Sequence, residues 1–350
     1  MYILYAVIAF SLLIIVHELG HFILAKLNGV KVHEFALGMG PKLFGFKIGE
    51  TDYNLRMLPI GGYVGMLGET EESDDPRSLN KKKPLQRFCV MIAGVAMNYI
   101  LAISLFAILA YNFGFSKSIV KDVRDNSPAK EAGIKAGDEI LGVNSHKVYV
   151  ANDLAYEILR TKGKPIEIEY KSGDQIFKKT VTPKMMKIPE QGKDDDSKKE
   201  DKESLIVGVN YEWLNNPSVF ESIKYASNEN LSFIKETYLG LKNLITGKGN
   251  LKTDVGGPVT IIKMTGAAAK AGVWNLMWLT AFISIQLAVL NLLPFPPLDG
   301  GKILFVLIEL ISGKKVPNKI AEYVEFIGLM ILFGLMILVT LKDVLFPIKI

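Results

Sequence analysis

Long apolar runs alternate with charged segments along this chain of 350 residues. A helix needs about 20 apolar residues to cross the hydrocarbon core of a bilayer. Four runs reach that length: residues 2–25, 86–113, 274–311 and 319–346. The first run lacks a basic start and a small-residue cleavage site, so we interpret it as a membrane helix and not as a signal peptide. The pattern predicts a polytopic α-helical membrane protein with about four transmembrane helices.

The segments between these runs have other patterns. Residues 30–68 alternate apolar and polar positions and are punctuated by glycines, which predicts a small sheet of short strands. Residues 187–203 contain almost nothing that can be buried and predict a flexible surface loop. Residues 218–246 have apolar positions at helical spacing, which predicts an amphipathic helix. That helix lies either on a membrane surface or on its own domain.

Composition supports a membrane protein, because 49% of the residues are hydrophobic and 22% are charged. The net charge of +5 does not indicate nucleic-acid binding, since the basic residues cluster beside the apolar runs and form no face interleaved with aromatic residues. The single cysteine, Cys89, excludes a disulfide framework and a cysteine-based metal site.

The basic residues also predict the orientation in the membrane. They gather between the first two runs and in the break between the last two, and such loops are normally cytoplasmic. The residues are Lys31, Lys42, Lys47, Arg56, Arg77, Lys81, Lys82, Lys83 and Arg87, followed by Lys314, Lys315 and Lys319. With four spans, both chain termini and the segment between the second and third runs are then extracytoplasmic.

The first apolar run contains the pattern H-E-x-x-H at His17, Glu18 and His21. On a helix, positions i and i+4 share one face, so both imidazoles can hold one zinc ion and the glutamate lies beside them as a general base. Ionisable residues within a span are costly and mark a protein interior or a wet cavity. A pair of satisfied core histidines is the alternative interpretation.

A catalytic zinc ion normally has three protein ligands and one water. His33 and His146 are poorly placed, whereas Asp299 is a carboxylate in the third run, which three prolines interrupt just before it. A membrane helix is interrupted only where protein or water satisfies the freed backbone groups, so this break indicates a cavity. We therefore expect Asp299 to be the third ligand. Alternatively, it caps the helix that resumes at Gly300.

Three sequence runs, HELGH, LPIGGYVGMLGE and NLLPFPPLDGG, occur here in an order that resembles the site-2 protease family of zinc intramembrane metalloproteases. The bacterial regulator-of-sigma-factor branch, which cleaves anti-sigma factors, is the most similar, and the resemblance covers essentially the whole chain. It implies one Zn²⁺ ion held by His17, His21 and Asp299, with Glu18 as the catalytic residue. It also implies a re-entrant β-sheet beside the active site and residence in the bacterial inner membrane. The substrate-binding residues that it implies are Asn291, Pro294, Pro296, Gly38 and Gly40.

Residues 114–213 resemble an extracytoplasmic α+β PDZ domain. Short apolar strands surround a helical stretch from Asn152 to Arg160 and a hairpin turned at Ser172 to Asp174. The bacterial form of this domain is circularly permuted, so its peptide-binding strand should come last, at residues 205–209 around Gly208. Such domains bind a peptide as an added strand on an exposed sheet edge. Residues 205–209 are alternatively only a closing edge strand.

Together these features predict a catalytic membrane part in two pieces, interrupted by the PDZ domain. The pieces are residues 1–113 and 274–350, and residues 214–273 form an amphipathic helix and linker. We interpret the chain as a zinc-dependent endopeptidase performing regulated intramembrane proteolysis in the lipid bilayer. Its partners are transmembrane segments of single-span proteins, such as anti-sigma factors trimmed by an upstream site-1-type protease, or remnant signal peptides.

Two other functions are compatible with parts of the pattern. The first is a non-proteolytic membrane PDZ scaffold with a vestigial metal site, which the intact Glu18 disfavours because a structural zinc site needs no base. The second is a soluble zinc protease with Glu34 as third ligand, which the apolar neighbours of His17 and His21 disfavour.

Overall fold

The computed structural model describes residues 2–69, 73–188 and 202–347. The chain divides into two compact units. Unit 1 comprises Met1–Leu105 and Thr237–Ile350, and unit 2 comprises Phe106–Glu236. Unit 2 therefore interrupts unit 1 in the chain, with wider bounds than residues 114–213, where the sequence places an inserted domain.

Among the described residues, four helices are long and apolar enough to cross a membrane. They are α1 (Tyr2–Leu27), α2 (Pro84–Phe113), α8 (Val273–Asn291) and α10 (Asn318–Leu345). The third apolar run is not one helix, because α8 ends at Asn291 and a separate helix, α9 (Asp299–Ser312), follows. The prolines between them remove backbone donors and cannot continue a helix. Four candidate helices and the expected break are therefore present among the described residues, although the third candidate is shorter than the predicted run 274–311.

The segment before α8 differs from the linker that the sequence predicts. It contains the short helix α6 (Leu251–Asp254) and the longer helix α7 (Pro258–Ala271). The Asp343 carboxylate of α10 accepts hydrogen bonds from the backbone N–H groups of Gly257 and Thr260, at 3.2 and 2.8 Å. A carboxylate at a helix N-terminus satisfies free donors and complements the helix dipole. A contact from the far end of the chain therefore stabilises α7, and the local sequence does not reveal it.

The β-sheet of unit 1 consists of two strands, β1 (Val32–Ile48) and β2 (Thr51–Met66), which pair antiparallel. Both strands bend back on themselves, so that Phe35 is paired with Tyr53 on one side and with Val64 on the other. Gly38, Gly40 and Gly61 have positive φ, a conformation that side-chain-bearing residues rarely adopt. The result is effectively four short strands, as predicted, and residues 62–66 form one edge.

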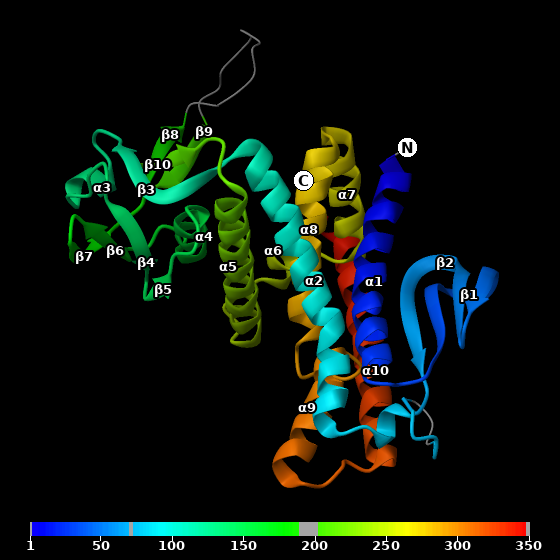
Figure 1. The fold of residues 1–350 in the computed structure, drawn as a ribbon. Helices are drawn as coiled ribbons and strands as arrows, with labels where there is room; N and C mark the ends of the chain where they lie inside the picture. Colours follow the sequence, from blue (N-terminus) through cyan, green and yellow to red (C-terminus); the bar gives the residue numbers. More distant parts are fainter. Residues whose placement is uncertain (1, 70–72, 189–201, 348–350) are drawn as a thin grey trace. The chain divides into compact units, whose positions relative to one another are not determined.

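The basic loops of unit 1 lie at one end of it. A 3-10 helix, η1 (Leu79–Lys81), precedes α2, and Lys81 lines a pocket together with Lys315 from the turn between α9 and α10. Figure 1 shows that turn at the opposite end of unit 1 from the start of α1. The two loops that carry the clustered positive charges therefore share a side.

Unit 2 contains an antiparallel sheet with the order β10-β3-β4-β6-β7, and β5 pairs with β4. A second, two-stranded sheet is formed by β8 and β9. Its hydrophobic core includes Ile140, Ile166, Ile168 and Val207, all nearly inaccessible to solvent. The elements are β3 (Phe115–Val123), α3 (Pro128–Glu131), β4 (Glu139–Val143), β5 (His146–Lys147), α4 (Asn152–Thr161), β6 (Ile166–Ser172), β7 (Gln175–Val181), β8 (Lys184–Ile188), β9 (Lys202–Ile206) and β10 (Val209–Leu214).

Two predictions for unit 2 are confirmed and two need correction. The helical stretch is α4, and the hairpin of β6 and β7 turns between Ser172 and Gln175. Residues 205–209 are not a single strand, because Gly208 has φ of +88° and separates β9 from β10. The two ends of the segment 187–203, predicted as a loop, are strand instead, since Lys187 pairs with Glu203 and Ile188 with Lys202. Residues 189–201 lie outside the described residues.

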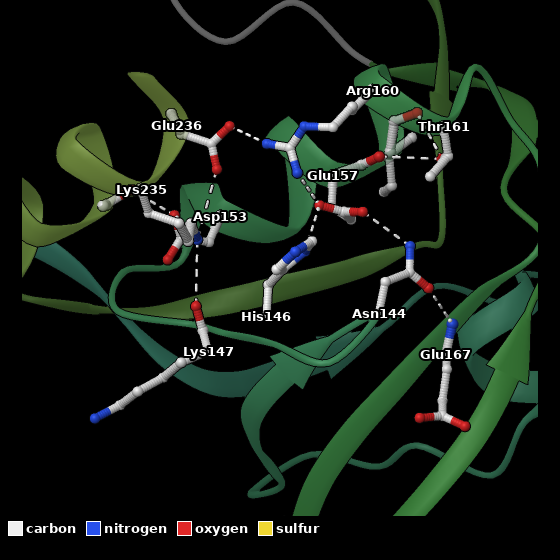
Figure 2. A network of polar contacts seen from close by, with 12 residues as sticks. Asn144, His146, Lys147, Asp153, Glu157, Arg160, Thr161, Glu167, Lys235 and Glu236 are labelled. Atoms are coloured by element: carbon white, nitrogen blue, oxygen red, sulfur yellow. Dashed lines mark hydrogen bonds and ion pairs between the residues drawn. The ribbon is translucent and has the colours of Figure 1, made fainter. Parts of the chain in front are cut away.

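The amphipathic helix is α5 (Val219–Ile245), and its first part packs on its own domain. Lys235 forms an ion pair of 2.9 Å with the buried Asp153 of α4, and Ser232 donates a hydrogen bond to the same carboxylate. Figure 2 shows Arg160 between Glu157 and Glu236, which extends this network. The residues up to Glu236 thus follow the domain-packing interpretation of the sequence.

Candidate metal centre

Two histidines of α1 and one aspartate of α9 bring three potential ligand atoms to one point. Asp299 Oδ2 lies 3.1 Å from His17 Nε2 and 3.3 Å from His21 Nε2. The two Nε2 atoms are 3.2 Å apart. Within the described residues, these three form the one group of histidine, cysteine or acidic side chains whose geometry could hold a metal ion.

The local sequence explains how each ligand atom reaches this point. His17 and His21 are one helical turn apart on α1, so both rings project from one face. Asp299 is the first residue of α9, directly after the proline-rich connection. The helix starts after Leu298 without a side-chain cap, so Asp299 does not act as the cap that the alternative interpretation assigned to it. Its carboxylate instead faces the imidazoles.

The three residues fit a tetrahedral metal ion. Bonds of about 2.0 Å in a tetrahedral zinc site separate neighbouring ligand atoms by about 3.3 Å, close to the observed spacings. Asp299 Oδ2 is buried and has no hydrogen-bond partner, although buried carboxylate oxygens normally have one. Two protonated Nε2 atoms at 3.2 Å would place donor against donor, whereas one cation attracts all three atoms. Nitrogen and carboxylate ligands in this number suit zinc.

Glu18 lines a cavity of about 470 Å³ together with the three candidate ligands. One wall of the cavity is the edge strand of β2, from Gly62 to Met66. Gly62 lies against α1, because a Cβ atom there would approach Glu18 Cγ to 3.3 Å. A carboxylate, a potential metal centre and an open strand edge therefore share one space.

Helix α2 contributes to the site, which the sequence interpretation missed. A Cβ atom on Gly94 would lie 2.3 Å from His21 Nε2 and 2.7 Å from His17 Cε1, so only glycine leaves room for both rings. His21 Nδ1 lies 2.8 Å from the carbonyl oxygen of Val90. His17 Nδ1 lies 3.3 Å from the side-chain amide of Asn98. A polar Asn98 within an apolar run was the available signal.

A partly exposed ion pair also lines the cavity. Lys302 of α9 lies 2.6 Å from the Glu69 carboxylate, which follows β2. The sequence interpretation did not pair these residues, because they are far apart along the chain. The pair joins the metal-site helix to the end of the sheet.

The expected substrate-binding residues are not among those that line the cavity in the described chain. Asn291 ends α8, and among the described residues that line the cavity the proline is Pro297, not Pro294 or Pro296. Pro296 packs against α9 and α10, since Cβ atoms on Gly301 and Gly328 would come within 2.9 and 2.0 Å of its backbone.

The glycines expected to bind substrate are found at bends. Gly38 and Gly40 lie where β1 folds back, away from the residues that line the cavity in the described chain. In unit 2, the carbonyl of Gly208 accepts a hydrogen bond of 2.9 Å from the backbone N–H of Arg124.

Glu34 is not a metal ligand in this arrangement. Its carboxylate accepts hydrogen bonds from Tyr63, Asn54 and Arg56 within the sheet. The soluble-protease alternative, which needed this carboxylate at the metal, therefore has no third ligand in Glu34.

Three side chains that could hold a metal ion thus lie beside the Glu18 carboxylate among apolar helices, and comparisons with known proteins show the class of protein. Residues 5–335 match the family model described as Peptidase family M50. A protein of Clostridium perfringens, whose name assigns it provisionally to the zinc metalloproteases, is 52% identical over 99% of this chain and all of its own length. The regulator of sigma-W protease RasP of Bacillus subtilis is 29% identical over 97% of both chains. The chain belongs to peptidase family M50 and is a metallopeptidase.

Proposed function

We propose that this chain is a zinc-dependent intramembrane endopeptidase that performs regulated intramembrane proteolysis of single-span membrane proteins. The observation that carries the proposal is the convergence of His17, His21 and Asp299 beside Glu18 in one cavity. The cofactor is one Zn²⁺ ion per chain, in agreement with the zinc metalloproteases among the relatives.

The chemistry follows from the residues that surround the cavity. His17, His21 and Asp299 hold the metal, and Glu18 is the general base. A zinc ion held there would acidify a water molecule and polarise the scissile carbonyl. Glu18 would accept a proton from the attacking water and donate it to the leaving nitrogen. No other role is needed for a carboxylate that lines the cavity without being one of the three convergent ligands.

The substrate must be unwound before it is cut, because a helix hides its carbonyls in its own hydrogen bonds and lipid offers no replacement. Among the described residues, the edge strand from Gly62 to Met66 is paired on one side only, and it lines the cavity. An unwound segment adding to this edge recovers its backbone hydrogen bonds next to Glu18. Substrate binding would also involve Asn291, Pro294 and Pro296, along the connection that leads to Asp299. The role of Gly38 and Gly40 in binding would be to let the sheet fold.

The site lies in the bacterial inner membrane in this proposal. The basic loops of unit 1 share one end, which the positive-inside rule assigns to the cytoplasm. Both chain termini and unit 2 are then extracytoplasmic. Trimmed anti-sigma factors and remnant signal peptides are the substrate class, and RasP, a named regulator of sigma-W, is a relative with 29% identity.

Unit 2 acts in this proposal as a PDZ domain that admits substrates already shortened by an upstream site-1-type protease. Its strand β10 pairs with β3 alone, so its other side is a free edge within the described part of the sheet. Such an edge can bind an extended peptide, with Gly208 at its start.

The decisive experiment compares Glu18→Gln with Asp299→Ala in the full chain, using zinc content and cleavage of a co-expressed single-span substrate. Glu18→Gln should keep zinc and lose cleavage by about 10²- to 10⁴-fold, because only the base is removed. Asp299→Ala should lose both. Full cleavage by Glu18→Gln would disprove the assigned chemistry, and normal zinc content in Asp299→Ala would disprove the assigned ligand. Failure of the natural chain to cleave any such substrate would favour the scaffold alternative.

The gating role is tested separately by removing residues 115–214. This variant should cleave substrates with an intact outer domain as well as trimmed ones, provided that it still binds zinc. Unchanged discrimination between the two substrates would exclude unit 2 as the gate.

A further inference from the structure

One face of α2 supplies the groups that contact the Nδ1 atoms of the two candidate histidine ligands. Val90, Gly94 and Asn98 are spaced by one helical turn each, so they form a row opposite the two imidazoles. Val90 provides a carbonyl oxygen to His21, and Gly94 provides space for both rings. Asn98 is the third member of this row, and its side chain reaches His17.

The contact to His21 shows what an imidazole in this site requires. Its Nε2 faces the other candidate ligand atoms, and its Nδ1 lies 2.8 Å from the Val90 carbonyl, which can only accept a hydrogen bond. The proton of the neutral ring is therefore on Nδ1, and the lone pair on Nε2 is free for a metal. Histidine ligands are commonly oriented in this way by an oxygen acceptor behind the ring.

The contact to His17 lacks that acceptor only because of the orientation of one amide. Asn98 is fully buried, its Nδ2 lies 3.3 Å from His17 Nδ1, and its Oδ1 is buried without a partner. A ring that binds metal through Nε2 carries its proton on Nδ1, so the amide N–H₂ group would face another donor. The amide oxygen and nitrogen have nearly the same size, and a half-turn of the amide exchanges them. That half-turn relieves the donor–donor contact and also provides the unpaired Oδ1 with a partner.

We propose that Asn98 is a positioning residue for the metal centre: its Oδ1 accepts the Nδ1 hydrogen of His17 and thereby fixes the ring with Nε2 toward the metal. This inference rests on the proposed function, since it requires the assigned ligands. Both histidines then donate the Nδ1 hydrogen to an acceptor on α2. The acceptor is the Val90 carbonyl for His21 and the Asn98 side chain for His17.

Asn98 also has a structural contact, which must be distinguished from the proposed role of its side chain. Its backbone carbonyl accepts a hydrogen bond of 2.8 Å from Ser284 Oγ, which joins α2 to α8. That contact does not involve the side chain and persists in any substitution of Asn98. Ser284→Ala removes the contact between the helices while leaving the amide in place, and it is therefore the matched control.

The experiment measures Zn²⁺ affinity by competition with a chelator in the full chain, purified in detergent and stripped of metal. The absorption spectrum of the Co²⁺-substituted protein reports the ligand geometry. Asn98→Leu has a side chain of similar length without an acceptor and should bind Zn²⁺ about 10- to 100-fold more weakly, with an altered Co²⁺ spectrum. Asn98→Asp retains an acceptor and should bind as tightly as the natural chain. Ser284→Ala should leave both measurements unchanged.

Two results would overturn the inference. One is natural Zn²⁺ affinity with a natural Co²⁺ spectrum in Asn98→Leu. The other is weakened Zn²⁺ binding in a folded Asn98→Asp variant, because that result would mean that the amide donor is required. The Asn98→Asp variant therefore tests the inference even if Asn98→Leu does not fold. Asp299→Ala is measured alongside. If it binds Zn²⁺ normally, the metal centre itself is misassigned, whereas its loss of Zn²⁺ together with normal binding in Asn98→Leu refutes only the role of Asn98.

Discussion

A buried carboxylate of unit 2, Asp153, and a partly buried carboxylate of unit 1, Asp299, have opposite surroundings. Asp153 in unit 2 accepts hydrogen bonds from the backbone of Tyr149 and from Ser232, and it pairs with Lys235. Asp299 in unit 1 has an oxygen without a donor and faces two imidazole nitrogens at 3.1 and 3.3 Å. Protein groups satisfy the first carboxylate, whereas the second belongs to a group of three side chains that could hold a metal ion.

This difference separates structural from functional clusters of ionisable residues. Both sites combine histidine, acidic and amide side chains, and both are mostly buried. In the unit 2 network of Figure 2, each acceptor is directed at a donor, for example Glu157 at Asn144 and Arg160. In unit 1, three acceptor-capable atoms are directed at one another. Convergence of acceptors, and not burial of charge, identifies the metal centre.

The strongest way to break the metal centre without touching a ligand is Gly94→Ala. The added Cβ atom would lie 2.3 Å from His21 Nε2 and must displace the ring. A displacement near 1 Å in a reactive site costs about 100-fold, so we expect losses of this size in zinc affinity and cleavage. Gly266→Ala in α7 is the control, because a Cβ atom there meets nothing within 4 Å. Normal zinc binding by Gly94→Ala would show that α2 does not confine the imidazoles.

In the unit 2 cluster, Asp153→Ala should lower the stability of the unit and leave zinc binding unchanged. Removing one partner from a buried ion pair costs about 3–5 kcal/mol, because Lys235 and Ser232 lose their acceptor. Hydrogen exchange of peptides from residues 115–181 should accelerate, while zinc content remains unchanged. Loss of zinc with unchanged exchange would contradict the structural role of this cluster.

Glu229 of unit 2 resembles Asp299 in one respect, since its Oε2 is buried without a hydrogen-bond partner. Burial raises its pKa to about 7 from 4.5, the charge of Asp153 adds to the increase, and a hydrogen bond from Tyr225 opposes it. A raised pKa means that the folded state favours the protonated carboxyl. Its contribution to stability is complete below about pH 4.5 and is lost as the pH rises through about 7.

Glu229→Gln should remove this pH dependence. At pH 8 the variant should be more stable than the natural chain by up to about 3 kcal/mol, because the buried charge is absent. At pH 5 the two should be similar. Hydrogen exchange of unit 2 at both pH values measures the effect, and Glu139→Gln on the exposed side of β4 is the control. Equal exchange of Glu229→Gln and the natural chain at pH 8 would refute the expectation.

The sequence predicted the features that depend on local geometry. The i and i+4 spacing of His17 and His21 determines their common face, and glycines mark where the sheet bends. The break before Asp299 was predictable because prolines cannot continue a helix. The meeting of Asp299 with the histidines required a further assumption about packing, which the structure supports by bringing the atoms within 3.3 Å.

The remaining features depend on contacts between distant segments. Asn98 meets His17 only because Gly20 allows α1 and α2 to approach closely, with a would-be Cβ atom 2.4 Å from the Ala93 carbonyl. The helix α7 was missed because Asp343 caps it from α10. Residues 205–209 read as one apolar strand, but the positive φ of Gly208 divides them. Periodicity along the chain contains none of these tertiary contacts.

The position of Asp299 at the start of α9 also bears on how the enzyme is made. During synthesis the two histidines leave the ribosome long before the aspartate, and the inserted unit 2 is translated in between. A nascent chain therefore carries an incomplete ligand set until its last membrane helices dock. With the proposed ligands, proteolytic competence would therefore arise only after the segment that carries Asp299 has been made.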